Sequence, residues 1–215
     1  MSAHAFSAEE RAAVYRAIAE RRDMRHFAGG EVAPELLARL LQAAHQAPSV
    51  GLMQPWRFIR ITRPELRDAI HGLVEAERVR TAEALGERSD EFMRLKVEGI
   101  LESAELLVAA LMDGREAHVF GRRTLPQMDL ASLSCAIQNL WLAARAEGLG
   151  MGWVSLFDPL ALAELARQGF VPGQARRQRD AVIAAPEAIV APQGVERPAG
   201  ATGQGFLQPG GNLAL

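Results

Sequence analysis

Three arginines stand close together in the segment 21–27, which reads RRDMRHF. The guanidinium groups of Arg21, Arg22 and Arg25 are permanently charged, and their N–H donors match the oxygens of a phosphate group. The same arginines follow a predicted helix, so they could instead complement the negative C-terminal end of that helix. The segment therefore indicates either an anion-binding site or a solvated helix terminus, and charge alone favours the terminus.

A carboxylate, Asp23, stands inside this basic cluster. A carboxylate repels a phosphate, so Asp23 does not fit a simple phosphate site. It either forms a local ion pair with Arg22 or Arg25, or it serves as a general acid or base close to a bound anion. The pattern alone favours the ion pair and leaves proton transfer as the alternative.

Two further segments place polar groups among apolar residues. Ser49, between Pro48 and Val50, could present its hydroxyl and amide to a ligand, or it could be an ordinary turn serine. The glycine-rich run 148–152 looks like part of a dinucleotide-binding fingerprint. That fingerprint follows a strand and opens a helix, whereas this run closes a helix and opens a strand, so we reject this interpretation.

The composition argues against several other functions. The 215 residues carry a net charge of −2, which gives no electrostatic reason to expect nucleic acid or an acidic membrane as a partner. The five histidines lack the spacing of metal ligands, and Cys135 is the single cysteine, so we expect no metal site. Because the sequence shows no membrane-spanning run and no signal-peptide pattern, we expect a cytoplasmic protein.

One long stretch, 129–159, must position these groups. Its first part is apolar on nearly every side at helical spacing, which predicts a buried helix that Asp129 caps and Gly148 or Gly150 ends. Cys135 in this helix is interpreted as a small core residue, and the three tryptophans, Trp56, Trp141 and Trp153, as core residues as well. The short apolar run 151–157 predicts an interior strand that carries Ser155.

The rest of the chain predicts a mixed α+β fold. A capping box formed by Ser7 and Glu10 opens the first helix, and Pro34 and Pro64 open the next two. Residues 81–90 are polar and weakly periodic, which indicates a mobile excursion or lid, and residues 113–127 form an irregular basic connection. We expect helices at about 8–22, 34–47, 64–80, 92–103 and 159–169, and strands at 57–61, 106–112 and 181–185.

Four segments together resemble the nitroreductase-like flavoproteins. Within that family the resemblance is to the 5,6-dimethylbenzimidazole synthases of the BluB type, because Asp23 stands where the wider family has a serine and GWVS follows at 152–155. It extends over about residues 6–170. We therefore expect an FMN-binding domain at 1–170 and a divergent, partly disordered C-terminal tail at 171–215. The segments are RRDMRHF at 21–27, APSVGLMQPWRF at 47–58, HVFGRRTLPQMDLAS at 118–132 and AIQNLWLAARAEGLGMGWVSLFDP at 136–159.

This resemblance implies a nitroreductase-like fold with a mixed central sheet flanked by helices. It also implies an interlocked homodimer with FMN in each of two interfacial pockets. The resemblance assigns a flavin-binding role to each residue that occupies a matching position of the family's motifs. The phosphate and ribityl chain are assigned to Arg21, Arg22, Arg25 and Lys96, the partner subunit's contribution to Ser49 and Met53, and the flavin ring to Gly152, Trp153 and Ser155.

The resemblance further implies that reduced FMN is the substrate and molecular oxygen the co-substrate. The products would be 5,6-dimethylbenzimidazole, the lower ligand of vitamin B12, and erythrose 4-phosphate, with reduced FMN supplied by a separate flavin reductase. Asp23 would move protons and Ser155 would position the ring edge. Two alternatives stay open: an FMN-dependent NAD(P)H nitroreductase or quinone reductase, and a catalytically silent flavin-binding dimer.

Overall fold

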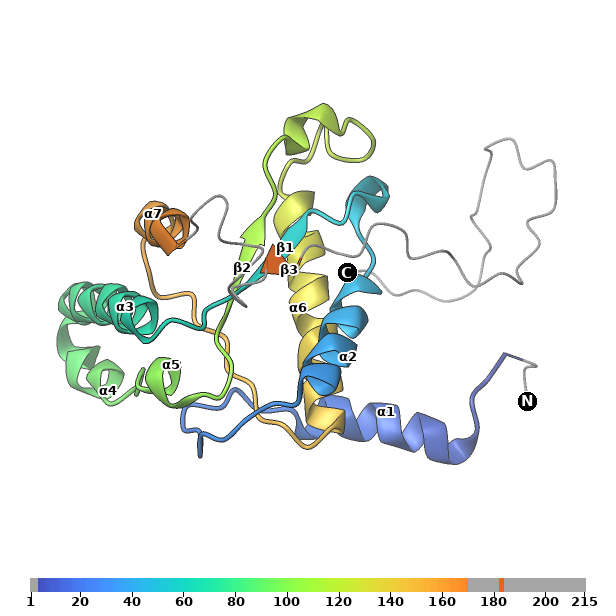
Figure 1. Cartoon of the computed structure of the whole chain (residues 1–215), viewed down its shortest axis with the longest axis horizontal. Coiled ribbons are helices and arrows are strands. Elements are labelled where there is room, and N and C mark those ends of the chain that lie inside the picture. Colours follow the sequence, from blue (N-terminus) through green and yellow to red (C-terminus); the bar gives the residue numbers. More distant parts are fainter. Residues whose placement is uncertain (1–3, 170–181, 184–215) are drawn as a thin grey trace. The chain divides into compact units, whose positions relative to one another are not determined.

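The computed structural model describes residues 4–169 and 182–183, which form an α+β fold with helices flanking a small sheet (Figure 1). Apart from β3, the predicted tail at 171–215 lies outside the described residues. No helix of the described part is both long and apolar enough to cross a membrane. The elements in chain order, with η for single turns of 3₁₀ helix, are α1 (Ala8–Glu20), α2 (Pro34–His45), η1 (Val50–Leu52), β1 (Trp56–Arg60), α3 (Pro64–Leu85), η2 (Gly86–Arg88), α4 (Ser89–Met93), α5 (Gly99–Glu102), β2 (Leu107–Leu111), η3 (Arg115–Ala117), α6 (Met128–Ala146), α7 (Pro159–Gly169) and β3 (Val182–Ile183).

Strand β1 lies in the middle of the sheet, in the order β2-β1-β3, and both neighbours run antiparallel to it. Trp56 is opposite Leu111, and Phe58 is opposite Ala109. All three predicted strands of this sheet are confirmed to within two residues. The predicted mixed sheet is not matched by the described strands, because parallel pairing among the described residues is limited to an isolated bridge outside this sheet.

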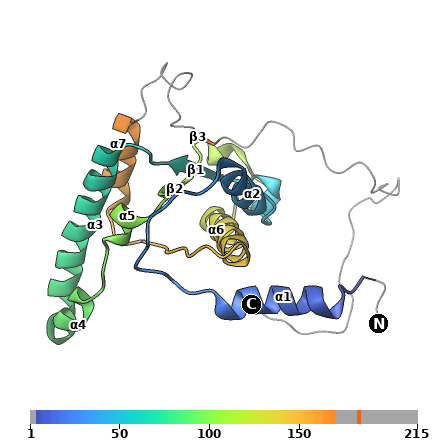
Figure 2. The ribbon, with the colours of Figure 1, turned by 60° about the horizontal axis from the view of Figure 1, so that its bottom comes forward.

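The main core lies between α2, α6 and the sheet, and Figure 2 shows α2 and α6 side by side. The apolar residues of α2 recur at helical spacing and point into this core, as predicted. Trp56 is 1% exposed, and its Nε1 donates to Nδ1 of His45 over 2.9 Å. Burial lowers the pKa of His45, which favours the neutral acceptor form. A smaller core joins α3, α5 and α7 through Ile61, Ile70, Val74, Val97, Ile100 and Leu162.

Helix α6 corrects three expectations. It begins at Met128 with Gln127 at the N-cap, so Asp129 lies inside the first turn rather than at the cap. The helix is buried on one side only, since Leu130 is 58% exposed and Cys135 is exposed. Cys135 is therefore not a core residue of this chain. The predicted end is confirmed, because Gly148 follows the helix with a φ of 80°.

The strand predicted at 151–157 is wrong for the described residues. Only Met151 pairs, in the isolated parallel bridge with Asp23, and residues 152–157 form no strand. An apolar run becomes a strand only where a neighbouring strand satisfies its N–H and C=O groups. The described chain gives this segment a single bridge, so the run continues as an extended connection to α7.

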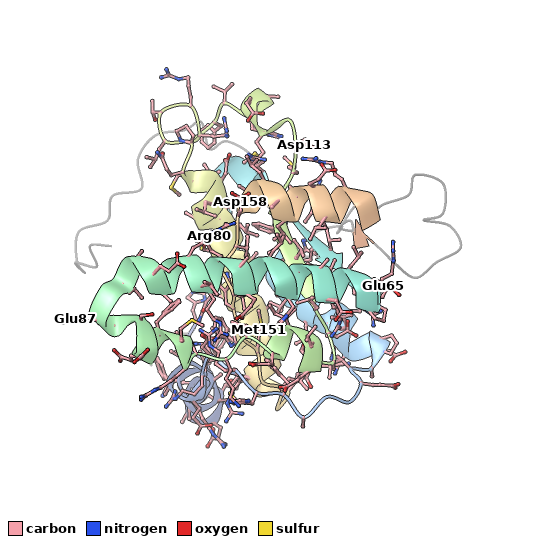
Figure 3. The ribbon with its side chains drawn as sticks, turned by 90° about the vertical axis from the view of Figure 1, so that its left-hand side faces the viewer. Glu65, Arg80, Glu87, Asp113, Met151 and Asp158 are labelled. Atoms are coloured by element: carbon pink, nitrogen blue, oxygen red, sulfur yellow. The ribbon has the colours of Figure 1, made fainter. Side chains whose placement is uncertain are left out.

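The lid predicted at 81–90 is instead helical. Helix α3 runs on to Leu85, and η2 and α4 follow directly. Figure 3 shows the helix continuing past Arg80 and the chain turning near Glu87. The reason is tertiary contact, because Ala82 is 4% exposed and Arg78 donates to the carbonyls of Met93 and Leu95. The helix predicted at 92–103 is broken, with residues 94–98 lying between α4 and α5.

Candidate functional site

A cavity of about 500 Å³ is the main candidate for a binding site. It lies among the segment 24–29, helices α2 and α6, the chain from Lys96 to β2, and the segment 148–154. Leu37, Leu40, Ile100 and Leu140 make its walls apolar. Arg25 and Lys96 contribute positive charge to its lining. The site therefore combines apolar walls with two cationic groups, a composition typical of small-molecule and cofactor sites.

The carboxylate of Asp23 ties together the two segments at the edge of this cavity. Its Oδ2 accepts a hydrogen bond from Nη2 of Arg25 over 2.5 Å, and its Oδ1 accepts from the backbone N–H of Trp153 over 3.0 Å. Beside it, the N–H of Met24 donates to the carbonyl of Met151 over 3.1 Å. The predicted ion pair between Asp23 and Arg25 is thus confirmed, and proton transfer by Asp23 stays a prediction.

Gly152 allows these segments to cross at close range. A Cβ atom built on Gly152 would lie 2.4 Å from the carbonyl oxygen of Met24, a distance at which the backbone must shift. At Gly150 the corresponding atom would lie 3.0 Å from Cγ of Met24. The glycines that resembled a dinucleotide motif therefore serve a packing requirement, which is the close approach of 150–152 to Met24.

The three arginines have different partners. Nη1 of Arg22 donates to the carbonyls of Ala19 and Arg21 over 2.7 and 2.8 Å, so Arg22 caps the C-terminal end of α1. Arg25 pairs with Asp23 and lines the cavity. Arg21 places its Cζ over the ring of Trp141, 4.6 Å from the ring centroid. The helix-terminus interpretation is therefore correct for Arg22. Arg21 instead contacts Trp141, and Arg25 pairs with Asp23.

The remaining predicted site residues fall into two groups. Lys96 and Gly152 line the cavity, and Trp153 and Ser155 lie on the segment that Asp23 holds. Trp153 is 41% exposed, so its interpretation as a core residue is wrong, whereas Trp141 is 6% exposed. Ser155 is exposed and is not part of the cavity lining.

Ser49 and Met53 are not brought to the cavity by this chain. Oγ of Ser49 accepts from the N–H of Gln54 over 3.0 Å, so Ser49 acts as a turn serine in this structure. Met53 is 9% exposed and closes the turn η1 through its N–H to the carbonyl of Val50. Neither residue lines the cavity.

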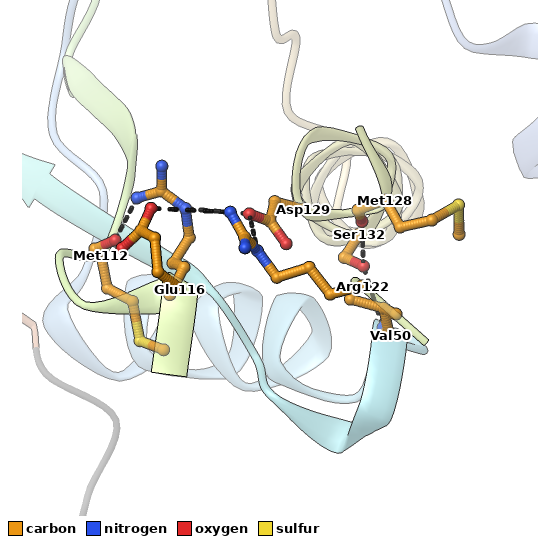
Figure 4. Close-up of polar contacts among 8 residues, drawn as sticks. Val50, Met112, Glu116, Arg122, Met128, Asp129 and Ser132 are labelled. Atoms are coloured by element: carbon orange, nitrogen blue, oxygen red, sulfur yellow. Dashed lines mark hydrogen bonds and ion pairs between the residues drawn. The ribbon is translucent and has the colours of Figure 1, made fainter. Parts of the chain in front are cut away.

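Sequence reasoning missed a buried charge cluster at the start of α6 (Figure 4). Oδ2 of Asp129 accepts from Nε of Arg115 over 3.1 Å and from Nε of Arg122 over 2.7 Å, and the residue is 3% exposed. Oγ of Ser132 accepts from the N–H of Val50 over 3.0 Å and donates to the carbonyl of Met128. These contacts fasten residues 113–127 and η1 to α6. The two arginines are visible in the sequence, but nothing local indicates that the loop folds back onto Asp129.

The fold and this site define the class of protein. The nitroreductase family model matches residues 18–169, and the chain belongs to this family of oxidoreductases. Among solved structures, a BluB-like flavoprotein from Clostridium difficile superposes with a TM-score of 0.53 at 23% identity, covering 74% of this chain and 84% of that one. Oxidized iodotyrosine deiodinase bound to FMN and 3-iodo-L-tyrosine gives a TM-score of 0.57 at 24% identity, covering 72% and 80%. These two likenesses establish the fold alone.

Two curated relatives narrow the comparison. The 5,6-dimethylbenzimidazole synthase of Rhodospirillum rubrum is 44% identical over 142 residues, which cover 65% of this chain and 67% of the relative. A protein of the same name from Rhodobacter capsulatus is 37% identical over 162 residues, covering 74% and 78%. The resemblance drawn from the sequence segments is thereby confirmed at the level of the family and its synthase branch.

We predict that Gly152→Ala destabilises the fold by about 1–3 kcal/mol, because the added methyl group overlaps the Met24 carbonyl and forces the crossing apart. Urea unfolding measures the change. Gly72→Ala on α3 is the control, since its Cβ meets nothing within 4 Å and alanine favours a helix by up to about 1 kcal/mol. Equal stability of Gly152→Ala and the wild type would contradict the close crossing.

Proposed function

We propose that this chain is a 5,6-dimethylbenzimidazole synthase, which uses molecular oxygen to fragment reduced FMN into 5,6-dimethylbenzimidazole and erythrose 4-phosphate. The observation that carries the proposal is the similarity to two synthases at 44% and 37% identity. In this proposal FMN is the substrate, and its reduced ring supplies the electrons that oxygen takes up. A separate flavin reductase provides the reduced FMN.

The cavity supports a flavin ligand in size and chemistry. Its volume of about 500 Å³ falls within the range of about 300–1,000 Å³ that is common for small-molecule sites. Arg25 and Lys96 supply cationic donors for a phosphate, and the apolar walls suit an aromatic ring system. In this proposal the apolar walls shield the bound ring from water, which protects it from side reactions.

Asp23 is the residue we assign to proton transfer. Its neighbours Met24 and Arg25 line the cavity, and its carboxylate is held by the Arg25 side chain of its own segment and by the N–H of Trp153 on the other, which restricts its position. A general acid or base must be held within hydrogen-bonding reach of the atom it serves. Ser155, two residues after Trp153 on the segment that Asp23 holds, is assigned to the hydrogen bond that orients the ring edge.

We also propose that two copies of the chain form a dimer and that Ser49 and Met53 reach the site of the partner copy. Exposed apolar side chains occur near η1 and the start of α6. The loop before α6 lies close to η1, since a Cβ built on Gly51 would be 2.8 Å from the carbonyl oxygen of Phe120, and one built on Gly121 would be 2.8 Å from Cγ2 of Val50. Contiguous exposed apolar surface marks an interaction site. The exposed apolar residues of the proposed dimer surface, with their exposed fractions, are Leu52 (86%), Val119 (61%), Phe120 (83%), Leu125 (50%) and Leu130 (58%).

Light scattering after size-exclusion chromatography tests the dimer. We expect the wild type at twice the chain mass of 23.3 kDa, and Phe120→Glu as a monomer, because a charge in the apolar contact is costly to bury. Val79→Glu is the control, since Val79 is an apolar residue on α3 that is 40% exposed and is not part of the proposed dimer surface. A monomeric wild type would refute this proposal.

The reaction itself is tested by loading the protein with chemically reduced FMN without oxygen and then admitting oxygen. We expect one 5,6-dimethylbenzimidazole for each flavin lost, measured by chromatography and mass spectrometry. Clean reoxidation to intact FMN would contradict the synthase. Subsequent turnover of NAD(P)H with retained FMN would then identify a nitroreductase or quinone reductase, and its absence a silent flavin-binding protein.

We predict that Asp23→Asn retains FMN binding and lowers the rate of product formation by about 10²-fold or more, because the amide cannot transfer a proton as the carboxylate does. Flavin fluorescence measures binding, and product analysis measures the rate. The control is Asp68→Asn, an exposed position on α3, which we expect to leave both unchanged. Loss of FMN binding in Asp23→Asn would instead assign Asp23 a structural role.

A further inference from the structure

Trp141 links the first arginine of the basic cluster to the rest of the site. It lies on α6 and is 6% exposed, so its ring is held by the surrounding chain. Arg21 places its Cζ over this ring, 4.6 Å from the centroid. Trp153 packs against the same ring in an edge-on arrangement, with the centroids 6.4 Å apart and the planes at 66°. The buried indole therefore contacts one residue from each of the two segments that Asp23 joins.

The contact with Trp141 leaves the hydrogen-bonding capacity of Arg21 unused. A guanidinium over an aromatic face is attracted by the ring and keeps its N–H groups for other partners. Among residues 4–169, no carboxylate forms an ion pair with Arg21. By contrast, Arg22 is engaged by the end of α1, and Arg25 is engaged by Asp23. Among the described residues, Arg21 therefore keeps all its guanidinium donors for an anion, whereas Arg22 and Arg25 each commit one Nη group.

We infer that Trp141 is a positioning residue that holds Arg21, which lies outside the cavity lining, as a further phosphate donor beside Arg25 and Lys96. The inference rests on the proposed function, because it takes the flavin phosphate as the anion. A side chain as long as arginine loses considerable freedom when it is fixed in place, and the indole restricts it before the ligand arrives. Trp141 therefore contributes to phosphate affinity without contacting the phosphate.

The experiment compares oxidised FMN with riboflavin, which lacks the phosphate. The ratio of the two dissociation constants, riboflavin over FMN, reports the contribution of the phosphate and cancels changes that affect the ring alone. Flavin fluorescence titration gives both constants. The variants are Trp141→Met, Trp141→Phe, Arg21→Met and the double variant Arg21→Met/Trp141→Met, with Arg16→Met on α1 as the control for loss of one exposed charge.

We expect Trp141→Met to lower the ratio about three- to thirtyfold, and Arg21→Met to lower it at least as much. Trp141→Phe retains a smaller aromatic face and should give an intermediate ratio, whereas Arg16→Met should leave it unchanged. In the Arg21→Met background, Trp141→Met should have no further effect on the ratio, because the two residues act as a unit. If Trp141→Met does not fold, the intermediate ratio of Trp141→Phe carries the test.

Proportional loss of both affinities in Trp141→Met, with an unchanged ratio, would show that Trp141 only supports the fold and would overturn the inference. So would an unchanged ratio in Arg21→Met, or an effect of Trp141→Met on the ratio that persists without Arg21. In these outcomes the wild type still binds FMN, and the proposed function stands. A wild type that binds neither flavin would overturn the proposed function and the inference with it.

Discussion

The carboxylate of Asp23 joins two segments that lie 130 residues apart in the sequence, and the candidate site depends on this junction. One oxygen accepts from the side chain of Arg25 and the other from the backbone of Trp153. The bond to Trp153 holds the two segments against each other beside the isolated bridge between Asp23 and Met151, and the bond to Arg25 fixes the carboxylate within its own segment. Gly152 is required at this point, since a side chain there would push the segments apart. The cavity wall that these two segments form therefore depends on the Asp23 carboxylate, which joins them, and on Gly152, which lets them approach.

The three neighbouring arginines, Arg21, Arg22 and Arg25, have different partners and therefore different roles. Arg22 follows the last turn of α1, where free carbonyls need donors, and it supplies them. Arg25 neutralises the carboxylate that would otherwise repel an anionic ligand from this part of the site. Arg21 rests on an aromatic face, which stabilises the charge without occupying its hydrogen bonds. The presence of Asp23 is thus compatible with a nearby anion site, because its charge is compensated by Arg25 and not by Arg21.

The parts of the fold that local signals encode could be predicted from the sequence. The capping box of Ser7 and Glu10, the proline at the start of α2 and the glycine after α6 all act within a few residues, and each is confirmed. The strand at 151–157 and the cap at Asp129 could not be predicted, because the outcome depends on distant partners. An apolar run looks the same with or without a neighbouring strand. Likewise, an aspartate at a helix start can cap the helix or receive arginines from a loop that folds back. In the site, the pair of Asp23 and Arg25 is local and was predictable, whereas the bond to Trp153 was not.

The proposed dimer and the proposed flavin site are linked by the position of the turn η1. Ser49 and Met53 flank this turn, and the exposed Leu52 belongs to it, so a partner that covers Leu52 also approaches Ser49. Within one chain, η1 is fastened to the start of α6 by Ser132, whereas the cavity contacts α6 further along, at Leu140 and Ala144. Ser49 therefore cannot reach the cavity of its own chain without breaking this attachment. If it contacts a flavin in the native fold, that flavin is bound by another copy, and the same association buries the apolar surface that α6 and η1 leave exposed.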